Sequence, residues 1–205
     1  MKEIVVATAN PGKLREIKDA LQGMEVLIVS LTDLSSISPI PIEIDEDGKT
    51  FRENALKKAR VVAQLTNRLT IADDSGLEVD YLNGNPGVRS ARFAGEEASD
   101  ADNNRKLLQL MEGIPAPQRG AFFRCVIAIV DPQGKEAWVE GGCRGVIGDS
   151  ERGGQGFGYD PLFILPELNK TLAELPIEVK NRVSHRGKAL AALKGVLGEF
   201  LWSQS

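Results

Sequence analysis

Two adjacent carboxylates, Asp73 and Asp74, point most directly to chemistry in this sequence. They follow a short apolar run and precede Ser75 and Gly76. Adjacent carboxylates repel each other, which favours a cation beside them, and Mg²⁺ prefers carboxylate oxygens together with water and substrate phosphates. Successive side chains of a strand point to opposite faces, so only one of the pair is expected to reach the metal. The alternative is an Asx-turn that closes the strand, with Gly76 in a left-handed conformation.

A candidate anion site lies near the amino terminus. A strand that feeds a helix through a Gly-containing turn presents backbone N–H groups and the positive end of the helix to an anion. A lysine at the end of the turn adds a point charge. The P-loop pattern is absent, because Leu14 follows the lysine. Taken alone, the segment fits a plain helix cap with a surface lysine better than an anion site, since helix starts with these residues are common. It consists of Thr8, Ala9, Asn10, Pro11, Gly12 and Lys13.

An acidic run comprises Glu43, Asp45, Glu46 and Asp47. Runs of like charge are usually solvated loops. This one becomes functional only if it supplies a second metal ligand.

A glycine-rich segment, Gly153–Gly158, leads into Tyr159, Asp160 and Pro161. Glycines on both sides of Phe157 leave its ring open for stacking on a base, and Asp160 is placed to accept a hydrogen bond from a ligand. A structural loop with Phe157 in the core is the alternative.

Several cations and the only histidine, His185, lie in the segment Lys180–Lys188, just before the predicted last helix. Cations are unfavourable at a helix amino terminus. The misfit indicates that an anion or a polar ligand is held there, whereas the alternative is a basic, solvated helix start.

Composition narrows the class of protein. The chain has 205 residues, enough for one domain or two joined lobes. A net charge of −4 argues against non-specific nucleic-acid binding. No run approaches the roughly 20 apolar residues of a membrane span, and the amino-terminal apolar run is too short for a signal peptide. Cys125 and Cys143 lack the spacing of a zinc site. Without a signal peptide or a membrane span we expect a cytoplasmic protein, in which both thiols are reduced.

Apolar periodicity, caps and turn residues predict an α/β fold on a mixed sheet. A strand is followed by a helix that Asn10 caps, then by a strand, a turn-rich acidic segment, a helix and a strand that ends at Asp73. A loop, a helix, a β-hairpin and a last helix complete the chain. The predicted ranges are 4–8, 10–23, 26–29, 31–49, 50–67, 69–72, 83–95, 99–111, 122–130 with 135–147, and 186–202.

The ordered set of segments resembles the inosine/xanthosine triphosphate pyrophosphatase family, the enzymes that clear deaminated purine triphosphates. Each motif alone is weak, but together they cover almost the whole chain. The likeness rests on Thr8–Lys13, Thr50–Ala55, Ala72–Leu77, Pro86–Arg92, Gly156–Pro161 and Ser184–Arg186.

The resemblance implies a single pyrophosphatase domain over residues 1–205. Its α/β fold would be elongated and two-lobed, on a central mixed twisted sheet flanked by helices, with the cleft between the lobes. It also implies a homodimer, with no nucleic acid or membrane partner. The implied reaction is Mg²⁺-dependent hydrolysis of a purine nucleoside triphosphate to the monophosphate and pyrophosphate.

The resemblance also assigns roles to residues. Thr8–Lys13 would hold the triphosphate, Asp74 would be the catalytic carboxylate and a metal ligand, and Glu46 the second metal ligand. Ser75 would be a substrate contact and Lys180 a substrate lysine. Phe157, Gly158, Tyr159 and Asp160 would form the loop on the base side, and His185 and Arg186 would read the base.

Hydrogen-bond logic then predicts the base. Donors from Arg186 or from the backbone favour the 6-keto group of inosine and xanthosine and disfavour the amino group of adenine. We therefore expect dITP and XTP to be preferred over dATP. Guanine shares the 6-keto group, so the expected preference over dGTP depends on its 2-amino group. A Maf-like pyrophosphatase of other base specificity and a non-catalytic nucleotide-binding module are the alternatives, and the presence of Asp74 disfavours the second.

Overall fold

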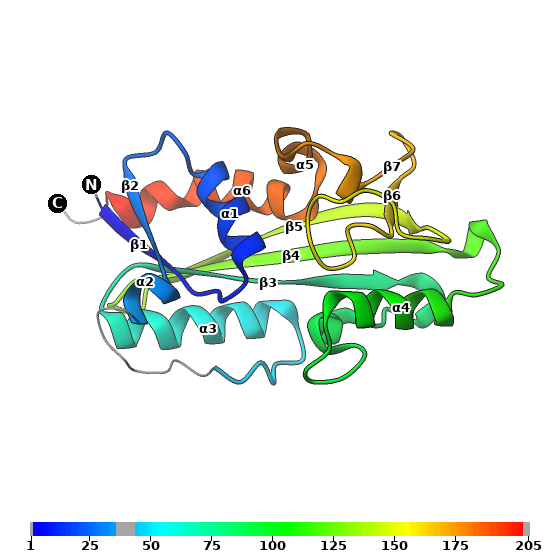
Figure 1. Cartoon of the computed structure of the whole chain (residues 1–205). Helices are drawn as coiled ribbons and strands as arrows, with labels where there is room; N and C mark the ends of the chain where they lie inside the picture. Colours follow the sequence, from blue (N-terminus) through cyan, green and yellow to red (C-terminus); the bar gives the residue numbers. More distant parts are fainter. Residues whose placement is uncertain (1, 36–43, 203–205) are drawn as a thin grey trace. The chain divides into compact units, whose positions relative to one another are not determined.

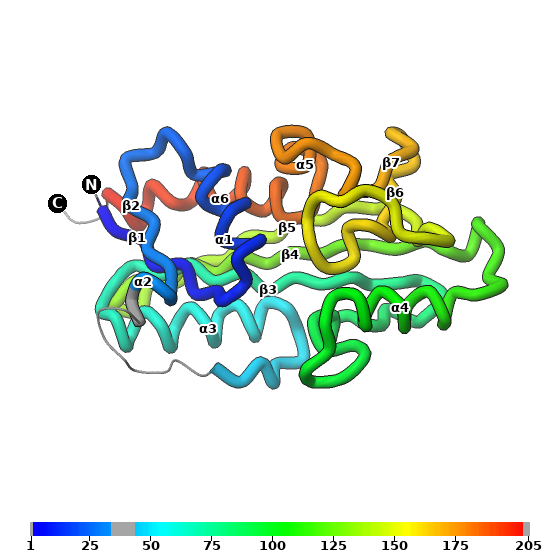
Figure 2. The backbone as a smooth tube through the Cα atoms, in the orientation of Figure 1, coloured from blue at the N-terminus to red at the C-terminus, as the bar shows by residue number. Residues whose placement is uncertain are grey.

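A computed structural model describes residues 2–35 and 44–202. Figures 1 and 2 show the path of the chain. Helices and strands alternate in the first part, and strands dominate the middle. In chain order the elements are β1 (Lys2–Val6), α1 (Pro11–Ala20), β2 (Val26–Ser30), α2 (Leu31–Ser35), α3 (Phe51–Thr66), β3 (Thr70–Val79), α4 (Asp100–Leu110), β4 (Gly120–Val130), β5 (Glu136–Ile147), β6 (Phe163–Leu165), β7 (Lys170–Thr171), α5 (Ile177–Val183) and α6 (His185–Leu201).

The strands form one mixed sheet in the order β2-β1-β3-β4-β5-β6-β7. β1 pairs in parallel with β2 and with β3. β6 pairs antiparallel with β5 and with β7. The predicted hairpin is confirmed as β4 and β5, which adjoin in the sheet and are joined by a turn in which Asp131 N–H donates to the Lys135 carbonyl at 3.0 Å. The α/β class with a mixed sheet is therefore confirmed.

The chain divides into two compact units, which are described separately. Unit 1 comprises Met1–Asp74, Cys125–Gly141 and Gly187–Ser205, and unit 2 comprises Ser75–Arg124 and Gly142–Arg186. Strands β3, β4 and β5 contribute residues to both units. Along β3, the change from one unit to the other falls at the peptide bond between Asp74 and Ser75.

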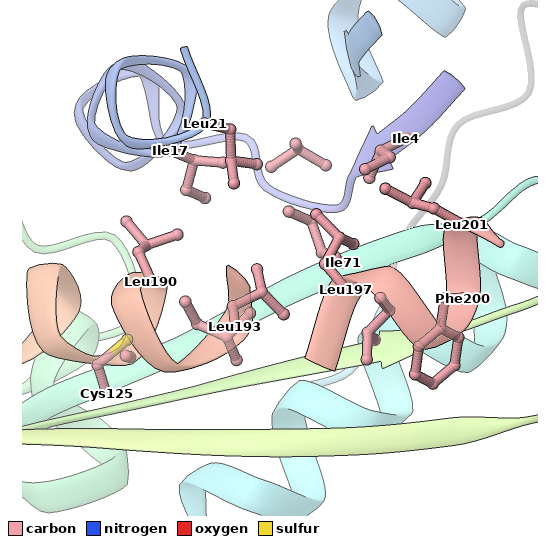
Figure 3. Packing of buried hydrophobic residues seen from close by; sticks show 14 residues of the cluster. Ile4, Ile17, Leu21, Ile71, Cys125, Leu190, Leu193, Leu197, Phe200 and Leu201 are labelled. Atoms are coloured by element: carbon pink, nitrogen blue, oxygen red, sulfur yellow. The ribbon is translucent and has the colours of Figure 1, made fainter. Parts of the chain in front are cut away.

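The core of unit 1 lies where α1 and α6 cover one face of its strands. Figure 3 shows Ile17 of α1 and Leu190 and Leu193 of α6 packed towards Ile4 and Ile71 of the strands. All five side chains are at most 1% exposed. Burying a side chain of this size contributes about 1.5–3 kcal/mol, so this cluster holds α1, and with it the loop at its amino terminus, against the sheet.

Helix α3 lies on the other side of the strands of unit 1 from α6 (Figure 1). Thr50 caps its amino terminus by accepting from Glu53 N–H at 3.1 Å, and Asn67 ends it in the left-handed conformation with φ 51°. Its buried side is mainly apolar, but Asn54 and Lys58 belong to the same buried set. Two polar residues within a buried stripe require partners in the protein.

Unit 2 has its own core, built from β3, β4, α4 and the segment that follows β5. The ring centroids of Phe123 and Phe163 lie 4.6 Å apart, with 50° between the ring planes. Aromatic pairs prefer such a tilted arrangement to a face-to-face stack. Helix α4 begins with a capping box in which Ser99 and Asp102 satisfy each other's backbone N–H groups. The predicted cap at Ser99 is confirmed.

Two strand and loop predictions were wrong. The strand predicted to end before Asp73 continues to Val79, so both carboxylates lie within β3 and not at its end. The Asx-turn alternative is also wrong, because Gly76 is not among the residues with positive φ. The apolar residues Leu77 and Val79 extend the strand because unit 2 buries them completely.

Helix boundaries differ from prediction in two places. The segment 31–49 was expected to be turn-rich throughout, but it begins with the short helix α2, and Ser30 accepts from Asp33 N–H there at 3.1 Å. Lys180 was expected just before the last helix, but it lies in α5, a separate short helix. Its apolar neighbours Val179 and Val183 pack on the core of unit 2. Because the helix is short, these residues form no long periodic pattern by which it could have been predicted.

Candidate functional site

In unit 1 the predicted phosphate loop is a capped helix start. The Asn10 side chain accepts from Lys13 N–H at 3.0 Å, and Asn10 N–H donates to Thr8 Oγ1 at 3.2 Å. Pro11 is the first residue of α1, and no acidic residue lies in its first turn. The positive end of the helix is therefore not neutralised by a carboxylate of its own first turn, which favours an anion at this terminus.

Lys13 and Asp73 form an ion pair beside this loop. The Asp73 side chain is fully buried, and the Lys13 side chain is 16% exposed. Asp73 also accepts from the thiol of Cys125 on β4 at 2.9 Å. Lys13 is thus paired with a buried carboxylate, while part of its side chain remains accessible to solvent.

Asp74 faces a second lysine. Lys58 Nζ lies 3.0 Å from Asp74 Oδ1 and 2.8 Å from Glu46 Oε1. Consecutive strand residues point to opposite faces, which is why Asp73 meets α1 and Asp74 meets α3. The two aspartates therefore have separate sets of partners.

The electrostatic environment suits Asp74 for accepting a proton. Burial raises the pKa of Asp74, and the charges of Lys58 and Lys13 offset this only in part. Burial opposes the charge of Lys58, but Asp74 and Glu46 outweigh it and raise the pKa of Lys58 above its ordinary value. Lys58 therefore stays an ammonium at neutral pH, while Asp74 is a stronger base than an exposed aspartate.

A divalent cation fits between Asp74 and Glu46, because their carboxylate oxygens already converge on one positive centre, the Lys58 ammonium. Magnesium takes carboxylate oxygens and completes its shell with water and phosphate oxygens. Among the residues that the structure describes, no group of three or more His, Cys, Asp or Glu side chains is arranged to hold a metal. Two carboxylates alone would hold such an ion only with water or phosphate oxygens completing its shell. Glu43 of the acidic run lies outside the described residues.

In unit 2 a buried ion pair anchors the glycine-rich loop. Asp160 Oδ2 accepts from Lys180 Nζ at 2.6 Å and from Phe157 N–H at 3.0 Å. Both charged side chains are at most 4% exposed. A buried pair is costly to break, because the remaining charge is left uncompensated. The position of the Phe157 backbone is therefore tied to α5.

The ring of Phe157 lies beside two cations. Lys180 Nζ is 5.0 Å and Arg186 Cζ is 5.2 Å from the ring centroid, both within the range of cation–π attraction. Arg186 donates to Ser75 Oγ at 2.7 Å. His185 stacks on Phe123 at 4.4 Å and 13°. The predicted base-side residues are thus brought together within unit 2, and Phe157 is only partly buried.

Helix α4 fixes the same loop from its other side. Gly158 N–H donates to Asp100 Oδ2 at 2.7 Å, and the Gly158 carbonyl accepts from Asn104 Nδ2 at 3.1 Å. Gly158 has φ 59°, a conformation that glycine adopts without strain. The Tyr159 hydroxyl donates to the Ser90 carbonyl at 2.8 Å. Both the N–H and the carbonyl of Gly158 are therefore hydrogen-bonded to side chains of α4, which fix the conformation of the loop.

Sequence reasoning placed most of these residues but missed some. The cluster of unit 1 contains Lys58 and Asn54, and neither residue had been assigned a role, although Asn54 lies within the segment Thr50–Ala55 of the resemblance. A signal existed, because both lie four residues apart on the buried side of α3 among Phe51, Ala55 and Ala59, where charged and amide groups need partners. Asp100 and Asn104 on α4 carried no comparable signal, since a helix start rich in Asp and Asn is ordinary.

Comparisons with known proteins find relatives over almost the whole chain. Residues 4–196 match the model of the Ham1 family. A protein of Geobacter sulfurreducens named dITP/XTP pyrophosphatase is 55% identical over 198 residues, which cover 97% of this chain and 98% of that one. One of Bacillus subtilis with the same name is 46% identical over 197 residues, 96% of this chain and 98% of that one.

Solved structures agree as well. A HAM1 protein from Coxiella burnetii superposes with a TM-score of 0.85 at 41% identity, covering 97% of this chain and all of that one. A nucleoside-triphosphatase, dITP/XTP pyrophosphatase, from Mycobacterium abscessus gives a TM-score of 0.73 at 46% identity, covering 93% and 98%. In the part of the chain that the structure describes, no helix is long and apolar enough to cross a membrane.

Proposed function

Because this chain belongs to the Ham1 family, we propose that it hydrolyses non-standard purine nucleoside triphosphates, dITP and XTP among them, to the monophosphate and pyrophosphate in a Mg²⁺-dependent reaction. The observation that carries the proposal is the convergence of Asp74, Glu46 and Lys58 in a chain whose relatives are named dITP/XTP pyrophosphatase. The glycine-rich loop and its two cations support the choice of a purine ligand.

The phosphate chain of the substrate would be held by the segment Thr8–Lys13. Backbone N–H groups at the start of α1 and the ammonium of Lys13 are the donors that a polyanion needs. Lys13 would keep its contact with Asp73 or exchange it for a phosphate oxygen. Either way, Asp73 limits where the ammonium can lie.

Asp74 and Glu46 would hold the metal. Magnesium, when bound, polarises the phosphate under attack and makes a water more acidic. Asp74 would accept the proton of the attacking water, directly or through the water shell of the metal. Lys58 balances the charge of the two carboxylates. Addition of one water across the bond between the α and β phosphates yields the monophosphate and pyrophosphate.

The base would be read by the residues of unit 2. Phe157 provides a ring face for stacking. The guanidinium of Arg186 has five N–H groups in a fixed plane, of which Ser75 accepts one. A donor that faces the 6-keto group of inosine or xanthosine instead faces the amino group of adenine, a mismatch of roughly 1–3 kcal/mol.

The likeness also supports a cytoplasmic homodimer. Cys125 and Cys143 are both unbridged and buried, as in a reducing compartment.

Light scattering coupled to gel filtration measures the mass directly, and a monomer at micromolar concentration contradicts the dimer.

A phosphate assay tests the activity. We expect no free phosphate from dITP until inorganic pyrophosphatase is added, and then a signal that depends on Mg²⁺ and disappears with EDTA. XTP should behave in the same way, whereas dATP and dGTP should be turned over much more slowly. Absence of a signal under every condition contradicts the proposal and favours a binding module.

A further inference from the structure

Asn54 is a buried amide that uses both ends of its side chain. It lies on α3, is 1% exposed, and accepts from Gly48 N–H at 2.8 Å through Oδ1. Its Nδ2 donates to Asp74 Oδ2 at 3.2 Å. Only an amide offers a donor and an acceptor in this arrangement. The two contacts link the acidic segment before α3 to the carboxylate on β3.

Both oxygens of Asp74 are held from α3. Lys58 lies one turn after Asn54, so the two side chains project from the same side of the helix. Lys58 contacts Oδ1 at 3.0 Å and Asn54 contacts Oδ2. A carboxylate with a partner on each oxygen has its plane fixed, which a single ion pair does not achieve.

The segment that carries Glu46 is held at its far end by the same residue. A Cβ added at Gly48 would overlap Asn54 Oδ1 and lie 2.9 Å from Glu53 Cβ. Lys49 N–H donates to Glu53 Oε2 at 2.7 Å. The backbone therefore passes so close to α3 at Gly48 that it fits only glycine, and the chain is held there two residues after Glu46.

We propose that Asn54 is a positioning residue, which orients the carboxylate of Asp74 and fixes the segment bearing Glu46 so that both converge on one cation. The inference rests on the proposed function for the identity of the reaction, but not for the cation site itself. Groups that orient metal ligands typically change metal affinity or activity by about 10–100-fold when they are removed.

The main test uses Asn54→Asp and Asn54→Leu. The aspartate keeps an acceptor for Gly48 N–H but turns a carboxylate towards Asp74, and the leucine removes both contacts. We expect kcat for dITP to fall about 10–100-fold, while KM changes less than about threefold. Titration of the free Asn54→Leu protein with Mn²⁺ by calorimetry should show a fall in affinity of about the same size.

A matched control exists in unit 2. Asn103 is also a buried amide, 3% exposed, that accepts from Ala94 N–H at 2.8 Å and donates to the Ala91 carbonyl at 3.0 Å. Asn103→Asp and Asn103→Leu should lower the melting temperature as the Asn54 variants do, but leave kcat and Mn²⁺ affinity within about twofold. Equal losses at both positions overturn the proposal in favour of a merely structural role.

Gly48→Ala provides a second route in case the Asn54 variants do not fold. It leaves every side chain of the cluster in place and displaces the backbone from Asn54, so it should lower kcat and Mn²⁺ affinity in the same direction. Unchanged Mn²⁺ affinity in the folded Asn54 or Gly48 variants overturns the inference. If the wild type binds Mn²⁺ but releases no pyrophosphate from dITP, the proposed function fails while the Mn²⁺ comparison still tests Asn54.

Discussion

The two units hold their polar residues in different ways. In unit 1 two ammonium groups, Lys13 and Lys58, face three carboxylates. In unit 2 the loop around Phe157 is fixed mainly through its backbone, by α4 and by Asp160, whose carboxylate also pairs with Lys180. Ion pairs can exchange partners with phosphate and metal, whereas backbone hydrogen bonds keep a surface of one shape. The first arrangement suits chemistry common to all triphosphates, and the second suits recognition of one kind of base.

The largest effect is expected at Asp74. Asp74→Asn keeps the size of the side chain but removes the proton acceptor and a metal ligand, so turnover of every nucleotide should fall by about 10²–10⁴-fold. Pyrophosphate release and circular dichroism measure this loss and the retention of the fold. Asp47→Asn, in the exposed part of the acidic run, is the control and should keep its activity. Near-normal turnover in Asp74→Asn contradicts the assignment.

Lys58→Met should separate charge balance from folding. Without the ammonium, Asp74 and Glu46 repel each other, and the loss of one partner in a buried pair costs about 3–5 kcal/mol. We expect a lower melting temperature in EDTA and a larger recovery on addition of Mg²⁺ than in the wild type. Lys57→Met, which loses only an exposed pair with Asp47, should show neither effect. The absence of a Mg²⁺-dependent recovery excludes a shared cation site.

In unit 2, Arg186→Met should change selectivity more than turnover. Loss of the donor removes the mismatch with adenine, so the ratio of kcat/KM for dITP over dATP should fall by about 5–150-fold, which corresponds to 1–3 kcal/mol. Arg182→Met removes an exposed cation of the neighbouring helix and should leave the ratio unchanged. A constant ratio in Arg186→Met places base recognition elsewhere.

The smallest effect is expected from the helix that supports the loop. Asp100→Ala removes the acceptor of Gly158 N–H, and KM for dITP should rise by about two- to twelvefold, as for one hydrogen bond, with little change in kcat. Asp102→Ala loses the capping box of the same helix and serves as the control for helix stability. A rise in KM of equal size in the control removes the specific role of Asp100.

Much of the fold could be predicted because local signals agreed with it. The caps at Asn10, Thr50 and Ser99 mark helix starts where they are observed. The continuation of β3 past Asp73 could not be predicted, since two carboxylates and a glycine read as a strand end. The two aspartates remain in the strand because lysines from two different helices neutralise them. The paired residues are far apart in the sequence, so no local pattern indicates the contacts.

The candidate site was predictable in its types of residue but not in their partners. The resemblance assigned Asp74, Glu46 and Arg186, yet it did not show that Lys58 joins the first two or that Ser75 accepts from the third. Such pairings depend on which faces of α3 and α6 meet the strands. Long-range packing sets those faces, whereas a local pattern does not.

Binding of nucleotides to the inactive Asp74→Asn variant tests the division of labour most directly. Titration calorimetry with dITP and dATP, in the presence of Mg²⁺, measures base preference without turnover. If unit 2 reads the base independently of the chemistry in unit 1, the variant should bind dITP more tightly than dATP by about 5–150-fold. Equal affinities for the two nucleotides contradict the account.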